Sequence, residues 1–200
     1  DKRVNDDLAK AAFDLYLKQL DFQKRFLLQE DVEQLQKYTL RIDDNLKNGS
    51  IILPQVGYDI LSQRISQAEN ISQELLESEF DNNKDELYET DPDKLPYVQN
   101  ETQLRDRWRK ILKARIISRY LDLVEQQKEK EDKEKDEDLW KQAKEKVGKT
   151  NRDFFVRLNQ ETLQDHYDRY FNAVTRAFDP HTNYMAPAKK EDFDIHMRGS

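Results

Sequence analysis

The sequence predicts an all-α protein: an irregular bundle of about six helices with one long loop and a short C-terminal exit segment. Charged residues form 38% of the 200 residues, whereas there are only four glycines and five prolines. The abundant Leu, Lys, Glu and Gln residues are good helix formers. A mean hydropathy of -1.06 would suit a disordered chain. However, nine Phe and nine Tyr recur at helical spacing, so we expect folded helices with charged outer faces.

Helical periodicity predicts three helices in the first eighty residues or so. The first runs from about Val4 to Leu20, and the second runs from Val32 to about Lys47 with Asp31 as its N-cap. The second should stop at Asn48-Gly49-Ser50, because glycine suits the left-handed position after a helix end. A third helix is expected from Pro54 to about Glu79, since the first turn of a helix tolerates proline.

The second half of the chain begins with a predicted loop. Residues 80–100 have no sustained period and contain two prolines, so they read as a long connection. Thr102 begins a fourth helix. Residues 128–138 carry uninterrupted charge, which predicts a hairpin tip or a mobile segment and not a domain boundary.

The last long helix is expected from Phe154 to Phe178. Gly148 should break the amphipathic stretch before it, and Thr150 or Asn151 should cap it. Its face is the most aromatic in the sequence, so it is predicted to be the core against which the other helices pack.

The fourth helix presents a basic face on an acidic chain. This face consists of Arg105, Arg107, Arg109, Lys110, Lys113, Arg115 and Arg119. Two interpretations stay open: a solvated face paired with nearby acids, or a patch that binds an anion or a partner.

Net charge and missing motifs argue against several classes of function. The net charge of -7 argues against nucleic-acid binding and against docking on anionic membranes, and the absence of cysteine excludes disulfides and thiol nucleophiles. No apolar run approaches membrane-spanning length. There is no G-x-S-x-G elbow, phosphate-binding glycine loop or H-E-x-x-H pair. His166, His181 and His196 are scattered. We therefore expect no catalytic residue, metal site or cofactor in this chain, which opens on Asp1 as a mature or trimmed chain would.

The segment after the last predicted helix forms a structural exit motif. Pro180 has no backbone N–H and biases Asp179 out of the helical region, so the helix should end there. This divides the chain into a helical domain, residues 1–179, and an exit segment, residues 180–200. Tyr184 is expected to pack back on the aromatic face, and His181 is interpreted as structural. The motif consists of Phe178, Asp179, Pro180, His181, Thr182, Tyr184 and Pro187.

The string FDPHTNYMAP, followed by Asp192-Phe193 and Met197, resembles the passage just upstream of the PDZ and catalytic domains of tail-specific (carboxyl-terminal processing) proteases. Other stretches match that family in order, so the resemblance covers essentially the whole chain. They are Phe13 to Asp21, residues 30–35, residues 40–46, and Leu95-Pro96 with Thr102 to Lys113.

The resemblance implies the non-catalytic N-terminal domain of an exported serine protease. The family's serine nucleophile and lysine base would lie beyond Ser200, so neither Lys189 nor Lys190 is the catalytic lysine. The family acts in the bacterial envelope, which implies a periplasmic location. Implied partners are protein substrates or adaptors and the downstream PDZ and protease domains, without nucleic acid or membrane insertion. The domain would serve as a scaffold and docking element.

The sequence leaves two other functions open. The alternative is a free-standing helical protein–protein interaction domain without a protease partner. A structural coiled coil is weaker, because the apolar stripes are broad and are interrupted by proline and glycine.

Overall fold

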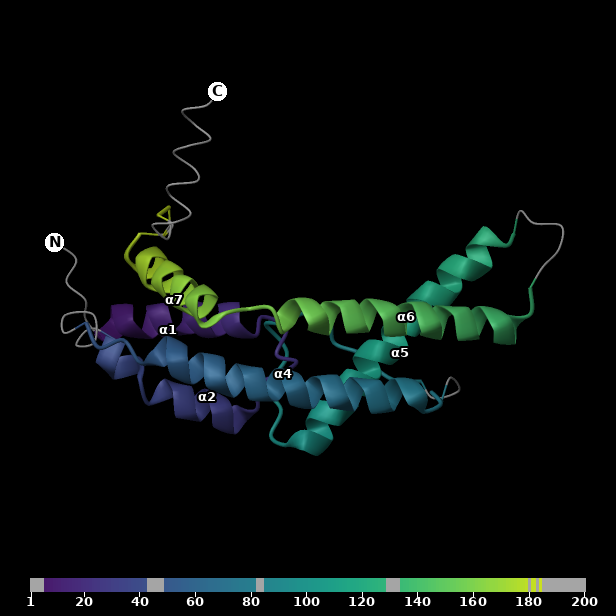
Figure 1. Ribbon diagram of the computed structural model, residues 1–200, viewed down its shortest axis with the longest axis horizontal. Helices are drawn as coiled ribbons and strands as arrows, with labels where there is room; N and C mark the ends of the chain where they lie inside the picture. Colours follow the sequence, from purple (N-terminus) through teal and green to yellow (C-terminus); the bar gives the residue numbers. More distant parts are fainter. Residues whose placement is uncertain are drawn as a thin grey trace, which may run out of the picture. The chain divides into compact units, whose positions relative to one another are not determined.

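A computed structural model describes residues 6–42, 49–81, 85–128, 134–179, 181, 182 and 184. In these ranges the chain forms six α-helices and no strand, which confirms the all-α prediction (Figure 1). A 3₁₀ helix, η1, is also present. In chain order the elements are α1 (Asp6–Leu20), α2 (Gln29–Gln36), η1 (Thr39–Arg41), α4 (Leu53–Glu77), α5 (Glu101–Gln126), α6 (Asp136–Leu158) and α7 (Leu163–Phe178).

The helices form two compact units, each with its own core. The first unit contains α1, α2 from Glu30 onward, η1, α4 up to Leu61, and α7. The second contains residues 23–29, the remainder of α4, the loop after it, α5 and α6. The predicted division into residues 1–179 and 180–200 is a different one, and it stays a prediction because most of the exit segment lies outside the described residues.

The first unit is built on the packing of α1 against α7 (Figure 1). Tyr16 and Tyr170 meet edge to face, with ring centroids 5.8 Å apart. Burial raises the pKa of Tyr170 to about 12 and raises the pKa of Tyr16 further. Ala residues on both helices let the two backbones approach. The buried residues of this pair are Ala9, Ala12, Phe13, Tyr16 and Leu20 of α1, and His166, Asp168, Tyr170, Ala173 and Val174 of α7.

The second unit is built on the packing of α5 against α6, around Trp108. The Trp108 side chain is fully buried and contacts the rings of Phe26 and Phe155, with centroids 5.9 and 5.4 Å away. Its indole N–H donates to the Arg25 carbonyl at 2.8 Å, so the buried donor is satisfied. Asn100 caps α5 by accepting a hydrogen bond from the Gln103 N–H.

The predicted boundary between the last two helices is wrong by about a dozen residues. α6 continues through Gly148 and Asn151 and ends at Leu158. The cap of α7 is Thr162, whose hydroxyl and Asp165 form a capping box. Asn151 does not cap a helix; instead its buried amide donates to the Ser72 hydroxyl at 2.9 Å. The aromatic residues therefore do not form the single core that was predicted. Phe155 belongs to the second unit and Tyr170 to the first.

The predicted helix from Val32 to Lys47 is also interrupted. α2 begins at Gln29, so Asp31 lies inside the first turn and is buried instead of capping the helix. The helix ends at Gln36. The Tyr38 and Arg41 N–H groups then donate to the carbonyls three residues earlier in the chain, which gives the tighter 3₁₀ geometry of η1. Residues 43–48 lie outside the described ranges. Gly49 has the predicted left-handed backbone, with φ 71°.

Candidate functional site

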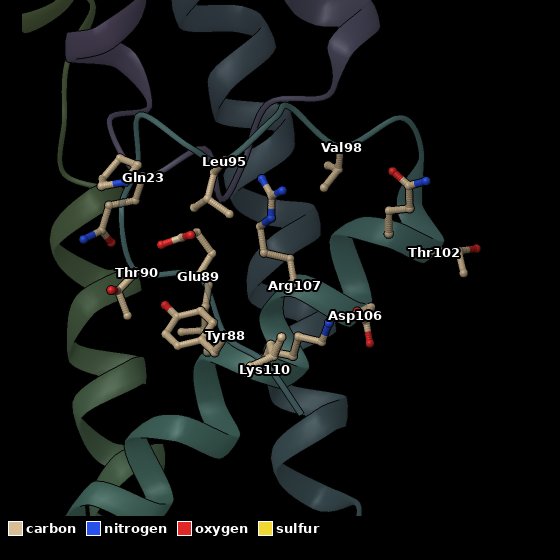
Figure 2. A pocket seen from close by; sticks show the side chains of 14 residues that line it. Gln23, Tyr88, Glu89, Thr90, Leu95, Val98, Thr102, Asp106, Arg107 and Lys110 are labelled. Atoms are coloured by element: carbon tan, nitrogen blue, oxygen red, sulfur yellow. Dashed lines mark ion pairs between the residues drawn. The ribbon is translucent and has the colours of Figure 1, made fainter. Parts of the chain in front are cut away.

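A cleft of about 410 Å³ lies beside the N-terminal half of α5, in the second unit (Figure 2). One wall is α5 itself and the other is the loop that precedes it. The volume is within the range of small-ligand and side-chain pockets. The lining residues are Gln23; Leu87, Tyr88, Glu89, Thr90, Pro92, Leu95 and Val98 of the loop; and Thr102, Gln103, Asp106, Arg107, Lys110 and Ile111 of α5.

Hydrogen bonds to backbone carbonyls hold the C-terminal end of the loop in place. Arg107 projects from α5 toward this wall (Figure 2) and donates to the Lys24 carbonyl and, at 2.9 Å, to the Pro96 carbonyl. The Lys24 ammonium donates to the Leu95 carbonyl at 2.6 Å. The Gln29 N–H donates to the Val98 carbonyl at 2.8 Å, beside an isolated parallel bridge. In a helix, backbone carbonyls accept hydrogen bonds from N–H groups of the same helix. The loop lacks such bonds, so the side chains of Arg107 and Lys24 and the Gln29 N–H satisfy its carbonyls instead.

An ionic clamp centred on Glu86 holds the other end of the loop. The Arg109 guanidinium binds both oxygens of Glu86, and the Lys113 ammonium lies 3.1 Å from one of them. The side chains of Glu86 and Lys113 are only 11% and 8% exposed. The hydrogen bonds from Arg109 and then from Lys113 hold the pKa of Glu86 well below its usual range.

The cations that line the cleft already have partners within the protein. Lys110 pairs with Asp106 at 3.2 Å, and Arg109 also binds that carboxylate. Burial alone would raise the pKa of Asp106, but the hydrogen bonds from Arg109 and Lys110 together bring it below its usual value. The lining contains no serine, cysteine or histidine, and its polar groups are threonines, glutamines, carboxylates, cations and the Tyr88 phenol. These groups suit the binding of a ligand through hydrogen bonds and apolar contacts.

Apolar side chains are left exposed at the cleft. Leu87 is 94% exposed and Tyr88 is 42% exposed, although both line it. Tyr88 and Leu95 face the cleft in Figure 2. A partner that covered them would remove apolar surface from water.

The Glu86 clamp gives a testable prediction. Replacing Glu86 with glutamine should open the loop more often, because the amide cannot form the two charge-assisted contacts with Arg109 and Lys113. We expect limited proteolysis within residues 85–95 to become about tenfold faster at neutral pH. Asp85→Asn is the matched control, since Asp85 is exposed in the same loop. Equal acceleration in both variants would show that the clamp does not hold the loop.

The same pair should show a defined pH dependence. A carboxylate with a depressed folded-state pKa stabilises the folded state above its unfolded pKa and loses this effect as the pH falls toward the folded value. The difference in amide-exchange protection between the wild type and Glu86→Gln, at Leu87 and Tyr88, should therefore be constant from neutral pH to about 4.5. It should shrink steadily below that. A difference that grew on acidification would contradict this assignment.

The predicted exit motif belongs to the first unit, whereas the cleft belongs to the second. α7 ends at Phe178, and Asp179 takes an extended backbone. The Asp179 carboxylate accepts from the His181 N–H and the Thr182 hydroxyl, both at 3.0 Å. The Tyr184 ring packs on Phe171, with centroids 5.1 Å apart. Pro180 and Pro187 lie outside the described residues, and a role of the motif in directing the chain stays a prediction.

His166 and His181, the histidines that the structure describes, do not form a site together. His166 is buried in α7, where its ring meets Tyr58 edge to face at 5.0 Å and its Nε2 lies 3.5 Å from the Glu161 carboxylate. The His181 side chain is exposed, and His196 lies outside the described residues. Within the described ranges, no group of three or more His, Cys, Asp or Glu residues could hold a metal ion. Nor is any helix there long and apolar enough to cross a bilayer.

Sequence reasoning found the basic face of α5 but missed Glu86, and it did not predict that Leu87 and Tyr88 would be exposed beside a cleft. Arg109 and Lys113, spaced by four residues, indicate that one helix face needs a counter-charge. The acid that supplies it lies in a loop without periodicity, among 41 acidic residues in the chain. No local signal distinguishes Glu86 from the rest.

Comparison with known proteins identifies the family. A family model described as "Tail specific protease N-terminal domain" matches residues 1–188. The chain is also similar to a tail-specific protease from Haemophilus influenzae, with 30% identity over 193 residues. That match covers 96% of this chain but 26% of the relative, so the chain spans about a quarter of the relative's length. The resemblance found in the sequence is therefore confirmed, and the chain belongs to the family of tail-specific protease N-terminal domains.

Proposed function

We propose that this chain is the non-catalytic N-terminal helical part of an exported carboxyl-terminal processing serine protease, and that it docks apolar segments of substrate or adaptor proteins. Family membership supports the link to a protease. On this proposal the chain works in the bacterial envelope, and the catalytic serine and lysine belong to another part of the polypeptide. Family membership also favours this function over a free-standing interaction domain.

The exposure of Leu87 beside the cleft on α5 is the observation that carries the docking role. A leucine that is 94% exposed contributes nothing to the core of this unit. It borders a cleft whose cations already have partners, so a ligand would gain mainly from apolar contact. Ordering of the loop by Glu86 and Arg107 reduces the conformational entropy that binding would cost.

Binding of an apolar tail tests this proposal. The probe is a fluorescein-labelled peptide that ends in leucine and alanine residues, titrated with the 200-residue chain and followed by fluorescence anisotropy. Leu87→Ser should weaken binding by about tenfold or more, since full burial of a leucine is worth about 1.5–3 kcal/mol. Leu121→Ser is the matched control, because Leu121 is 56% exposed on α5 and does not line the cleft.

Two results would contradict the docking role. One is an unchanged affinity in Leu87→Ser, and the other is an equal loss in both variants. The peptide should also stay intact throughout the titration, because the cleft offers no activated nucleophile. Cleavage that persisted after rigorous purification would contradict the non-catalytic assignment.

A further inference from the structure

The basic face of α5 divides into two halves that differ in their ionic partners. In the first half, Arg105 pairs with Glu74 at 2.6 Å, and Arg107 donates to backbone carbonyls. Glu86 and Asp106 bind the next three cations, Arg109, Lys110 and Lys113. The second half, Arg115 and Arg119, is different. In the described part of the chain, Arg115 has no ion pair, and the contact of Arg119 is a long one of 3.9 Å to Asp122 on the same helix. Only the first half therefore behaves as a charge-paired face.

α6 adds further cations beside this second half. Lys146 and Arg157 line a cleft of about 350 Å³ together with Arg115 and Arg119. Val147, Thr150 and Phe154 complete the lining, so no carboxylate is among these residues. Neither Lys146 nor Arg157 makes an ion pair within the ranges that the structure describes. Four cationic residues thus line one cleft in a chain of net charge -7; Arg115 and Arg119 are half-buried, and Lys146 and Arg157 are exposed.

Like charges that line one cleft without counter-ions repel one another. An anion bound in the cleft would reduce this repulsion. The Arg119 Nε is buried and has no hydrogen-bond partner in the described structure, which leaves a strong donor unsatisfied. Burial lowers the pKa of Arg115, although the Tyr88 phenol acts in the opposite direction, and no carboxylate contributes. A ligand carboxylate could accept a hydrogen bond from the Arg119 Nε and supply the negative charge that Arg115 lacks.

The shape of the cleft favours an extended ligand over a single compact ion. Lys146 and Arg157 are eleven positions apart on α6, which corresponds to about 16 Å along the helix. Val147 and Phe154 lie between them and give the cleft an apolar floor. An extended peptide places successive side chains on opposite faces about 3.3 Å apart. Acidic residues at alternate positions could therefore face the cations while the backbone follows the cleft.

We propose that the cleft formed by Arg115, Arg119, Lys146 and Arg157 binds an acidic segment of a protein in extended conformation. This site is separate from the cleft beside Leu87 and does not depend on the docking of apolar tails. It adds a preference for acidic sequence to the chain's recognition of other polypeptides.

Anisotropy titration tests this inference directly. The probe is a short fluorescein-labelled peptide in which glutamate alternates with valine, and its counterpart carries glutamine in place of glutamate. The wild-type chain should bind the glutamate peptide, with affinity falling as salt is added, and should not bind the glutamine peptide. Arg119→Gln combined with Arg157→Gln should weaken binding by about tenfold.

The control variant, Arg105→Gln with Lys149→Gln, removes one cation from each of the same helices outside the cleft. It should bind like the wild type. Arg115→Gln with Lys146→Gln gives a second test of the cleft if the first variant does not keep the wild-type helical circular dichroism. Equal losses in cleft and control variants would overturn the inference, as would failure of the wild type to bind the acidic peptide. Binding to inorganic phosphate or to vesicles of anionic phospholipid without binding to the peptide would overturn it too.

Discussion

Replacing Trp108 with alanine is expected to lower the free energy of unfolding of the second unit by about 3–5 kcal/mol, the largest effect of any substitution considered. The indole is fully buried among Phe26, Phe155 and the α5 backbone. Its removal leaves a cavity that the surrounding helices can fill only in part, and it leaves the Arg25 carbonyl without its donor. Urea unfolding followed by circular dichroism measures the loss.

Trp140→Ala is the matched control, because the chain has two tryptophans. Trp140 is only half-buried and meets the Tyr120 ring edge to face at 5.7 Å. Its replacement should cost about 1 kcal/mol, and the fluorescence of the remaining Trp108 then reports the core directly. If the two variants lost equal stability, Trp108 would not be the centre of this core.

The second large effect is expected in the first unit, where glycine is required for space. A Cβ atom on Gly57 of α4 would overlap the Tyr16 hydroxyl and lie 3.2 Å from its Cζ. In an unconstrained helix, alanine would be better than glycine by about 0.5–1 kcal/mol. Here the Tyr16 ring is fully buried against Tyr170 and has little room to move. Gly57→Ala should therefore destabilise the unit by about 1–3 kcal/mol.

A double-mutant cycle isolates the cause. Tyr16→Phe removes the hydroxyl that would overlap the new methyl group. That hydroxyl is buried without a hydrogen-bond partner in the described structure, so the single change should cost little. The double variant should recover most of the stability, with a coupling of about 1–3 kcal/mol in thermal or urea unfolding. Strict additivity of the two changes would show that the overlap is not responsible.

The sequence was sufficient for the fold class because long apolar stripes are a local property. It was misleading at Gly148 and Asn151, which form a typical break-and-cap pattern but lie inside α6. Asn151 uses its amide on Ser72, a residue on another helix, and the local sequence carries no trace of that partner. The true cap, Thr162 with Asp165, has an equally ordinary sequence. Tertiary contacts therefore decided where α6 ends and α7 begins.

The candidate sites show the same division between local and distant information. The cationic side chains of α5 were visible as one face. Pairing with nearby acids is observed in its first half, whereas anion or partner binding by its second half stays a proposal. Which half is neutralised depends on Glu86 and Glu74, which come from segments whose approach to α5 is set by the fold. The convergence of Arg157 on Arg119 likewise requires the packing of α6 on α5. Spacing along one helix cannot supply either fact.

Neither unit is continuous in the sequence, and this has a consequence for biosynthesis. α1 leaves the ribosome before its packing partner α7, which is the last described helix along the chain. At roughly 5–20 residues per second, translation leaves the apolar side of α1 without that partner for on the order of ten seconds. Residues 23–29 must likewise wait for α5 before Trp108 can bond to Arg25. We therefore expect the nascent chain to depend on protection from aggregation until Phe178 has emerged.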